Sequence, residues 1–318
     1  MQVHPDIAAL RSDRAPQRAA QAVIQGAKQD WAQEPGASEL LADLEAYGRG
    51  APFECCAMLE AVFIGQGEAE RLMDALSRHY CKAMAANPIG QPPFRNGFDG
   101  MASSILLARC ERAQLMLQAR EPGDMHHSGY VFSDATRFDA VLAGEAEARI
   151  VRKVSEHDGQ ARFAEEAVSL RPGQRYAFDL SSDTLVIDQV ARRLVALRLL
   201  RTAEEPHPGR EFCAASGRML HQSAATIAIS RQETILALLG RMGRTDAAPA
   251  IADLARSGGD TSLRWQAVRE ALALDSATGF RLLGELARRA GDPLAHQAGA
   301  LRAQLLETHP ELAQLEIA

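Results

Sequence analysis

The chain has 318 residues, enough for more than one folding module, and its 47% apolar and 24% charged residues are typical of a globular protein rather than a disordered one. Its formal net charge of −6 gives no electrostatic reason to bind nucleic acid or anionic lipid. Five cysteines without C-x-x-C spacing indicate reduced thiols, and there is neither an apolar signal segment nor a run of about 18 apolar residues. We therefore expect a cytoplasmic protein that has no membrane-spanning segment.

The first part of the chain has the spacing of apolar residues that α-helices require. Between residues 15 and 87, four amphipathic stretches follow one another with short connections. The segment NPIGQPPFRNGFDG, rich in Pro, Gly and Asn, then marks a boundary. The sequence therefore predicts a helical N-terminal unit over residues 1–90.

Between residues 103 and 201 the period changes to two. Ala146, Ala148 and Ile150 alternate with charged residues, as a half-buried strand requires. The runs DTLVIDQV and RLVALRLLR and the turn sequence LRPGQRYAFD add further strands. Residues 103–120 fit either a β-hairpin or one helix, and the sheet that follows favours the hairpin. We predict a β domain over residues 101–205.

From about residue 223 the helical period returns, and the sequence repeats itself. LRWQA at 263–267 and LAHQA at 294–298 are 31 residues apart, and LARSGGD and LARRAGD end 32 residues apart, at Asp260 and Asp292. A fixed offset is typical of stacked helical hairpins. Residues 222–318 resemble the HEAT family of helical repeats, with a period near that of its short bacterial form. The resemblance implies a surface that docks another protein.

The middle region resembles a cupin, a small antiparallel β-barrel. The resemblance rests on FDAVLAGEAEARI, with a strand, a Val-Leu-x-Gly turn and an alternating strand, and on VSLRPGQRYAFD with its Pro172–Gly173 turn. The predicted fold class is therefore α+β: a helical N-terminal unit, an antiparallel cupin-like β-barrel and a C-terminal stack of HEAT-like repeats.

The residues that the cupin resemblance assigns to a metal are replaced here. Metal-holding cupins carry two histidines and a glutamate before the first glycine and a third histidine after the second turn. Arg137 stands seven residues before Gly144, in the glutamate position, and Tyr176 takes the third histidine position. Arg137 would bring positive charge where a divalent ion needs N, O or S donors. We expect a barrel without metal or other cofactor.

Such a barrel would bind a small ligand or serve a structural role. The candidate ligand-binding residues are Tyr130, Arg137, Tyr176 and Asp179. His126 and His127 keep a metal-binding alternative open, although adjacent strand residues point to opposite faces and cannot both bind one ion. In that alternative the chain is a cupin-type oxidoreductase or isomerase that uses a divalent metal such as iron on a small polar substrate.

The segment LRWQAVRE places Arg264, Trp265 and Arg269 within two helical turns. Arg and Trp are enriched at protein interfaces, which makes these three the candidate partner-binding residues. The alternative is that Trp265 packs between repeats and Arg269 is solvated. The leading hypothesis is a non-catalytic regulatory or adaptor protein with a protein partner and no nucleic-acid partner; self-association through the repeats is compatible with either function.

Overall fold

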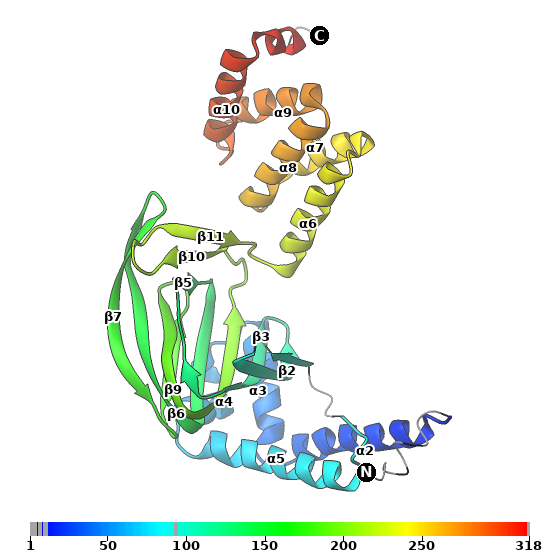
Figure 1. The fold of residues 1–318 in the computed structure, drawn as a ribbon, viewed down its shortest axis with the longest axis vertical. Helices are drawn as coiled ribbons and strands as arrows, with labels where there is room; N and C mark the ends of the chain where they lie inside the picture. The colour runs from blue at the N-terminus through cyan, green and yellow to red at the C-terminus, as the bar shows by residue number, and fades with distance from the viewer. Residues whose placement is uncertain (1–4, 6–7, 9–11, 92–94, 99, 317–318) are drawn as a thin grey trace. The chain divides into compact units, whose positions relative to one another are not determined.

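Helices occupy both ends of the chain and strands its middle in the computed structural model, which describes residues 5, 8, 12–91, 95–98 and 100–316 (Figure 1). The chain divides into two compact units, Met1–Gln222 and Ser223–Ala318. The predicted α+β class, with an antiparallel sheet domain between helical ends, is confirmed. No helix in the described part of the chain has both the length and the apolar character that a membrane crossing requires.

The described N-terminal region is helical, as predicted. Its elements are α2 (Ala15–Ala32), α3 (Ala37–Arg49), the 3-10 helix η1 (Phe53–Cys55), α4 (Ala57–Phe63) and α5 (Glu68–Ala86). Each α-helix buries one apolar stripe; in α2 the buried residues are Ala20, Ile24, Ala27 and Trp31, spaced by three or four positions.

Two long strands organise the middle of the chain. The strands are β1 (Arg95–Phe98), β2 (Ala102–Cys110), β3 (Ala113–Arg120), β4 (Gly123–Asp124), β5 (Gly129–Phe132), β6 (Ala135–His157), β7 (Gln160–Leu170), β8 (Arg175–Asp179), β9 (Asp183–Thr202), β10 (Gly209–Cys213) and β11 (Met219–Ser223). β6 and β9 pair with each other, β3 and β4 join the free edge of β9, and β8 and β7 join that of β6. β11, β10 and β5 form a second sheet, and β2 and β3 form the predicted hairpin.

Gly144 does not form the turn expected between two strands. β6 continues through it, and the pairing register with β9 shifts on both sides. Gly144 has a φ of 92°, and a Cβ there would lie 2.2 Å from the carbonyl oxygen of Arg193, so only glycine fits. This bulge separates the half of β6 that pairs with β8 from the half that pairs with β7. The Pro172–Gly173 turn, which joins β7 to β8, is present as predicted.

The N-terminal helices and the sheet share one hydrophobic core. Leu115, Phe138 and Leu199 face the helices from three neighbouring strands, and the ring of Phe138 stacks on that of Phe53 with centroids 4.1 Å apart. The guanidinium of Arg201 lies over the ring of Tyr47. The boundary expected near residues 90–101 therefore does not separate two cores, and the first compact unit extends to residue 222.

The second unit is a series of helices with a core of its own. Its elements are α6 (Ile227–Arg241), η2 (Thr245–Ala247), α7 (Ala248–Arg256), α8 (Thr261–Leu274), α9 (Ser276–Arg288), α10 (Ala295–Thr308) and η3 (Pro310–Glu316). The LARSGGD and LARRAGD segments fall at the ends of α7 and α9, and LRWQA and LAHQA fall in α8 and at the start of α10. The sequence repeat thus matches a repeat of helix positions. Membership of the HEAT family stays a prediction.

Candidate functional site

A cluster of charged side chains lies on the face of the sheet opposite the helices. Because strand side chains alternate, Phe138 and Ala140 face the helices while Arg137 and Asp139 face the interior enclosed by the strands, here called the lumen. Arg198 of β9 stands directly opposite Asp139. Both faces of β6 are covered at this point, so the charges are buried.

Asp139 is the centre of this cluster, and its side chain is almost fully buried. Arg198 donates two hydrogen bonds to it, from Nε at 2.7 Å and from Nη2 at 2.9 Å. Arg137 Nη2 lies 3.0 Å from Asp139 Oδ2. Burial alone would raise the pKa of Asp139, but the charges of Arg198 and Arg137 outweigh it and hold the pKa below its ordinary value. Asp139 is therefore an ionised counterion.

Arg137 is buried without enough hydrogen-bond acceptors. Only 8% of the residue is exposed, and its Nε and Nη2 atoms have no hydrogen-bond acceptor among the described residues. Its guanidinium lies over the ring of Phe178, 4.6 Å from the centroid. Burial lowers the pKa of Arg137 to about 10, which still leaves it charged at neutral pH. Arg137 therefore keeps its ion pair with Asp139, but its hydrogen-bonding capacity is not fully used, which costs free energy in a buried place.

The cluster borders a small cavity in the lumen. Its polar lining is Gln118, Arg120, Asp139, Tyr176 and Arg198, and its apolar lining is Val141, Leu170, Leu185, Ile187, Leu194 and Ala196. The enclosed space is about 20 Å³, enough for roughly one water molecule. A more open pocket of about 270 Å³ shares Gln118 and Arg120 with it and is lined further by Gly97, Phe98, Ala102, Ser103 and Ser104.

The groups in the lumen are suited to binding rather than to proton transfer. Asp139 is ionised and engaged by two arginines, which makes it a weak base. The hydroxyl of Tyr176 lies within hydrogen-bond distance of Ser169 O and Gln174 Oε1, and burial raises the pKa of Tyr176. The described lining residues include no histidine, cysteine or lysine. What they offer is guanidinium groups aimed at a confined space.

The predicted ligand-binding residues are only partly brought together. Arg137 and Tyr176 both face the lumen, from β6 and β8. Tyr130 is buried elsewhere, in the core beneath the second sheet, where its hydroxyl donates to Glu165 at 2.6 Å and accepts from Arg149. Asp179 is exposed, and its Oδ1 accepts a hydrogen bond from Ser181 N.

The two histidines of the metal-binding alternative lie outside the lumen. His126 and His127 are exposed in the segment before β5, and His127 Nε2 lies 2.8 Å from the carbonyl oxygen of Ile187. In the described part of the chain, no three His, Cys, Asp or Glu side chains gather where they could hold a metal ion. Within those residues His126 and His127 therefore lack the further donor groups that a divalent metal site needs.

Sequence reasoning missed Asp139, Arg198 and Arg120. A signal was present: each of the first two is the single charged residue within an apolar run, FDAVLA or LVALRLL. Asp139 also follows Arg137 by two positions, which places both on the same face of a strand. Their pairing could not be predicted, because it depends on the register between β6 and β9.

In the comparisons with known proteins, no protein family and no curated protein matches this chain. Among solved structures, hazelnut (Corylus avellana) vicilin is similar at 16% identity, with 36% of this chain and 32% of the vicilin covered and a TM-score of 0.28. KdgF from Halomonas sp. matches at 9% identity over 35% of this chain and 88% of its own, with a TM-score of 0.25.

A third similar structure is a cupin superfamily protein from Desulfitobacterium hafniense. It is 16% identical, covers 34% of this chain and 83% of its own, and has a TM-score of 0.25. This chain spans about a third of the vicilin's length. The likeness is one of fold, and at these TM-scores it carries no argument about activity, substrate or partner.

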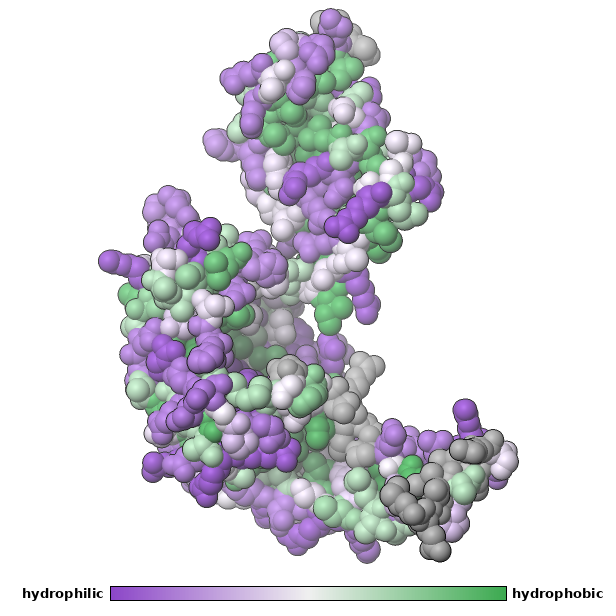
Figure 2. Space-filling model, in the orientation of Figure 1, coloured by the Kyte–Doolittle hydropathy of each residue, from purple (hydrophilic) through white to green (hydrophobic). Residues whose placement is uncertain are grey.

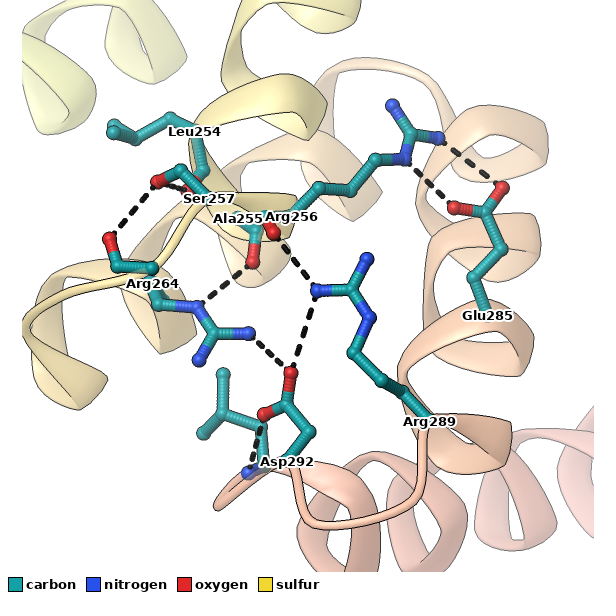
Figure 3. Close-up of polar contacts among 10 residues, drawn as sticks. Leu254, Ala255, Arg256, Ser257, Arg264, Glu285, Arg289 and Asp292 are labelled. Atoms are coloured by element: carbon teal, nitrogen blue, oxygen red, sulfur yellow. Dashed lines mark hydrogen bonds and ion pairs between the residues drawn. The ribbon is translucent and has the colours of Figure 1, made fainter.

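The predicted docking residues of the second unit do not form one surface. Arg264 is buried; its Nε donates to Ala255 O at 3.0 Å and its Nη2 to Asp292 Oδ2 at 2.6 Å (Figure 3). Arg289 bridges the same aspartate to the carbonyl oxygen of Arg256 (Figure 3). Arg264 thus ties α7 and α8 to the loop before α10. Its side chain is not available to a partner.

Trp265 and Arg269 face a different environment. Together with Leu272, Ala273 and Leu301 they line an open, mostly apolar groove on α8 and α10. Trp265 is half-buried against the core of the unit, and Arg269 is exposed. Part of the Trp265 side chain and the side chain of Arg269 are therefore accessible to solvent at this groove.

Proposed function

We propose that this chain is a non-catalytic regulatory or adaptor protein whose barrel binds a small ligand and whose helical repeats dock a partner protein. The buried cluster of Arg137, Asp139 and Arg198 carries the proposal. A scaffold has no need of it, because replacing buried ion pairs with well-packed apolar side chains is often neutral or stabilising. Retaining charge in the lumen, with donors left unsatisfied, supports a binding role.

The chemistry of the same cluster supports the binding hypothesis over the cupin-type enzyme. Asp139 is held ionised by two guanidiniums, and Tyr176 is a weak acid. Neither group is poised to exchange a proton near neutral pH. Binding without turnover is the function that this set of side chains supports best.

The docking role is supported by the groove on α8 and α10. Aromatic and arginine side chains anchor many protein interfaces, and Trp265 and Arg269 lie side by side at this groove. Figure 2 shows hydrophobic side chains gathered among hydrophilic ones on the displayed face of the second unit. Stacked helical pairs, as in HEAT-like repeats, present such extended surfaces.

A ligand screen tests the binding role. The full chain is mixed with a library of anionic, neutral and cationic small molecules at constant ionic strength, and its melting temperature is recorded. At least one compound raises the melting temperature and is recovered chemically unchanged. If no compound in any charge class stabilises the protein, the binding role is wrong.

A comparison of bound partners tests the docking role. Trp265→Ala and Arg269→Ala are purified beside the wild type and beside Arg288→Ala, which changes an exposed arginine on α9. The first two variants lose a specific partner that the wild type and the control retain, while circular dichroism shows that all four remain folded. An unchanged partner set in both groove variants would refute docking at this groove.

A further inference from the structure

Helix α6 carries apolar side chains on two opposite faces. On one face Leu236 is buried, and Ile229 and Leu239 pack with it in the core of the second unit. A surface helix of a globular protein normally places polar residues opposite such a stripe. Here the opposite face, called the outer stripe below, consists of four large apolar residues of the helix and its C-cap, each more than half exposed: Ile227, Ile235, Leu238 and Met242.

The outer stripe lies on the side of α6 that faces away from α8. Gln266 of α8 donates a hydrogen bond to the carbonyl oxygen of Glu233 at 2.9 Å. A Cβ on Gly240 would meet the carboxylate of Glu270, which also belongs to α8. Because successive helical residues are about 100° apart, the outer stripe is on the opposite side.

This side of α6 is an end of the helical stack, since α6 is the first helix of the second unit (Figure 1). A further helical repeat would pack on it if the stack were longer. Terminal repeats of such stacks normally present a polar outer face to solvent. The apolar face of α6 therefore indicates that another helix covers it.

Two arginines lie along the outer stripe. Arg231 is four residues from both Ile227 and Ile235 and so stands within the stripe, and Arg241 stands at its edge. Both are exposed, and neither forms an ion pair with the residues that the structure describes. The only carboxylate of α6, that of Glu233, is half-buried on the α8 side. The stripe thus combines apolar surface with positive charge alone.

We propose that the outer stripe binds an amphipathic α-helix of a partner protein whose apolar face is flanked by aspartate or glutamate. The stripe runs along one helix, which matches the apolar face of a single partner helix. Carboxylates beside that face would pair with Arg231 and Arg241. This inference rests on the proposed docking function, and it adds a surface separate from the groove on α8 and α10.

Two other occupants match the charges less well. A second copy of the chain, packed through the same stripe, would bring the arginines of both copies together without a carboxylate. A helix that lies in a membrane surface keeps its basic residues on the polar face, whereas Arg231 stands within the apolar one. The net charge of −6 also opposes the approach of the chain to an anionic membrane.

Synthetic peptides with the full chain test the proposal, with fluorescence anisotropy as the readout. Two peptides form the same amphipathic helix of Leu and Ala, one with Glu and the other with Lys beside the leucines. A third contains the residues of the Glu peptide in scrambled order. The Glu peptide binds about tenfold or more tightly than the other two. Equal binding of the three, or no binding of the Glu peptide, would overturn the proposal.

Variants of the full chain locate the bound peptide. Leu238→Asp removes an apolar contact and adds a repelling charge, so affinity for the Glu peptide falls about tenfold or more. Arg231→Glu combined with Arg241→Glu reverses the preference in favour of the Lys peptide. Val154→Asp, a similarly exposed apolar position on β6, leaves affinity unchanged, and circular dichroism of all variants matches the wild type. Unchanged affinity in Leu238→Asp would show that the peptide binds elsewhere.

The remaining outcomes separate this surface from the proposed groove and from other occupants. If Trp265→Ala loses the Glu peptide and Leu238→Asp retains it, docking takes place at the groove and the outer stripe is refuted. A dimer in light scattering that Leu238→Asp dissociates would make a second copy the occupant. Sedimentation of the chain with phosphatidylserine vesicles, lost in the same variant, would make it a membrane. Either result would overturn the proposal.

Discussion

Among single residues, Asp139 has the largest effect on the lumen, because it compensates the buried guanidinium of Arg137 and the partly buried one of Arg198. Asp139→Asn keeps the size of the side chain and removes the charge. We expect a loss of unfolding free energy of about 3–5 kcal/mol, the usual cost of leaving a buried charge unpaired. Urea unfolding measures it, with Glu166→Gln, an exposed partner of Arg152, as the control.

The pH dependence of stability follows from the same residue. The pKa of Asp139 in the folded chain lies below the value of about 3.9 for an unfolded aspartate. Its ionised form therefore stabilises the fold above about pH 4, and this contribution is lost as the pH falls through the folded-state pKa. Below pH 4 the wild type should lose stability more steeply than Asp139→Asn. If the stability of the two proteins fell equally with decreasing pH, Asp139 would not be the buried counterion.

Gly144 is a second residue whose substitution should have a large effect on stability. Gly144→Ala places a Cβ against the backbone of Arg193 in a left-handed conformation, so β6 or β9 must shift. Gly159→Ala is the matched control, since Gly159 also has a positive φ but its Cβ would meet nothing closer than 3.9 Å. Thermal unfolding should show a much larger loss of melting temperature for Gly144→Ala. Similar losses of melting temperature in the two variants would mean that the positive φ, and not the contact with Arg193, accounts for the effect.

Among the structural elements, the helices of the second unit depend for their stability on the ion pair between Arg264 and Asp292. Arg264 and Asp292 are almost fully buried in the folded chain. Arg264→Met leaves Asp292 with the backbone N–H of Leu294 and the longer contact to Arg289 as its partners, and we expect a loss of local stability on the order of 3 kcal/mol. Hydrogen exchange should accelerate in α7 and α8 and stay unchanged in β6 and β9. Arg288→Met, an exposed change on α9, should have no such effect.

Elements with a strong local period could be predicted from the sequence. Ala146 and Ala148 are buried in β6 as alternation requires, and the hairpin over residues 102–120 is present. Gly144 shows where the local pattern misled: a glycine between two apolar runs fits a turn and a bulge equally well, and the pairing with β9 decides. Arg137 could be placed in the barrel interior from the sequence. Its proximity to Arg198 could not be predicted, because it depends on the pairing register between β6 and β9.

At the scale of the whole molecule, the shared core of the first unit makes its helices part of the barrel. Removing residues 1–94 would expose Leu115, Phe138 and Leu199, which the helices cover. We expect that truncated protein to aggregate, because an uncovered apolar sheet face is an aggregation site. Removing residues 223–318 should leave a folded first unit, since the second unit has a separate core. A soluble, folded barrel without its helices would contradict the shared core.

The proposed function requires that the lumen binds a small molecule and does not convert it. The most direct measurement is proton NMR of a mixture of small anionic, neutral and cationic molecules with an equimolar amount of the full chain, followed over many hours. We expect saturation transfer from the protein to at least one compound, loss of this transfer in Arg198→Met, and no new resonances. New resonances that grow only with the wild-type protein would show turnover, and absence of any transfer would show that the lumen binds none of these compounds.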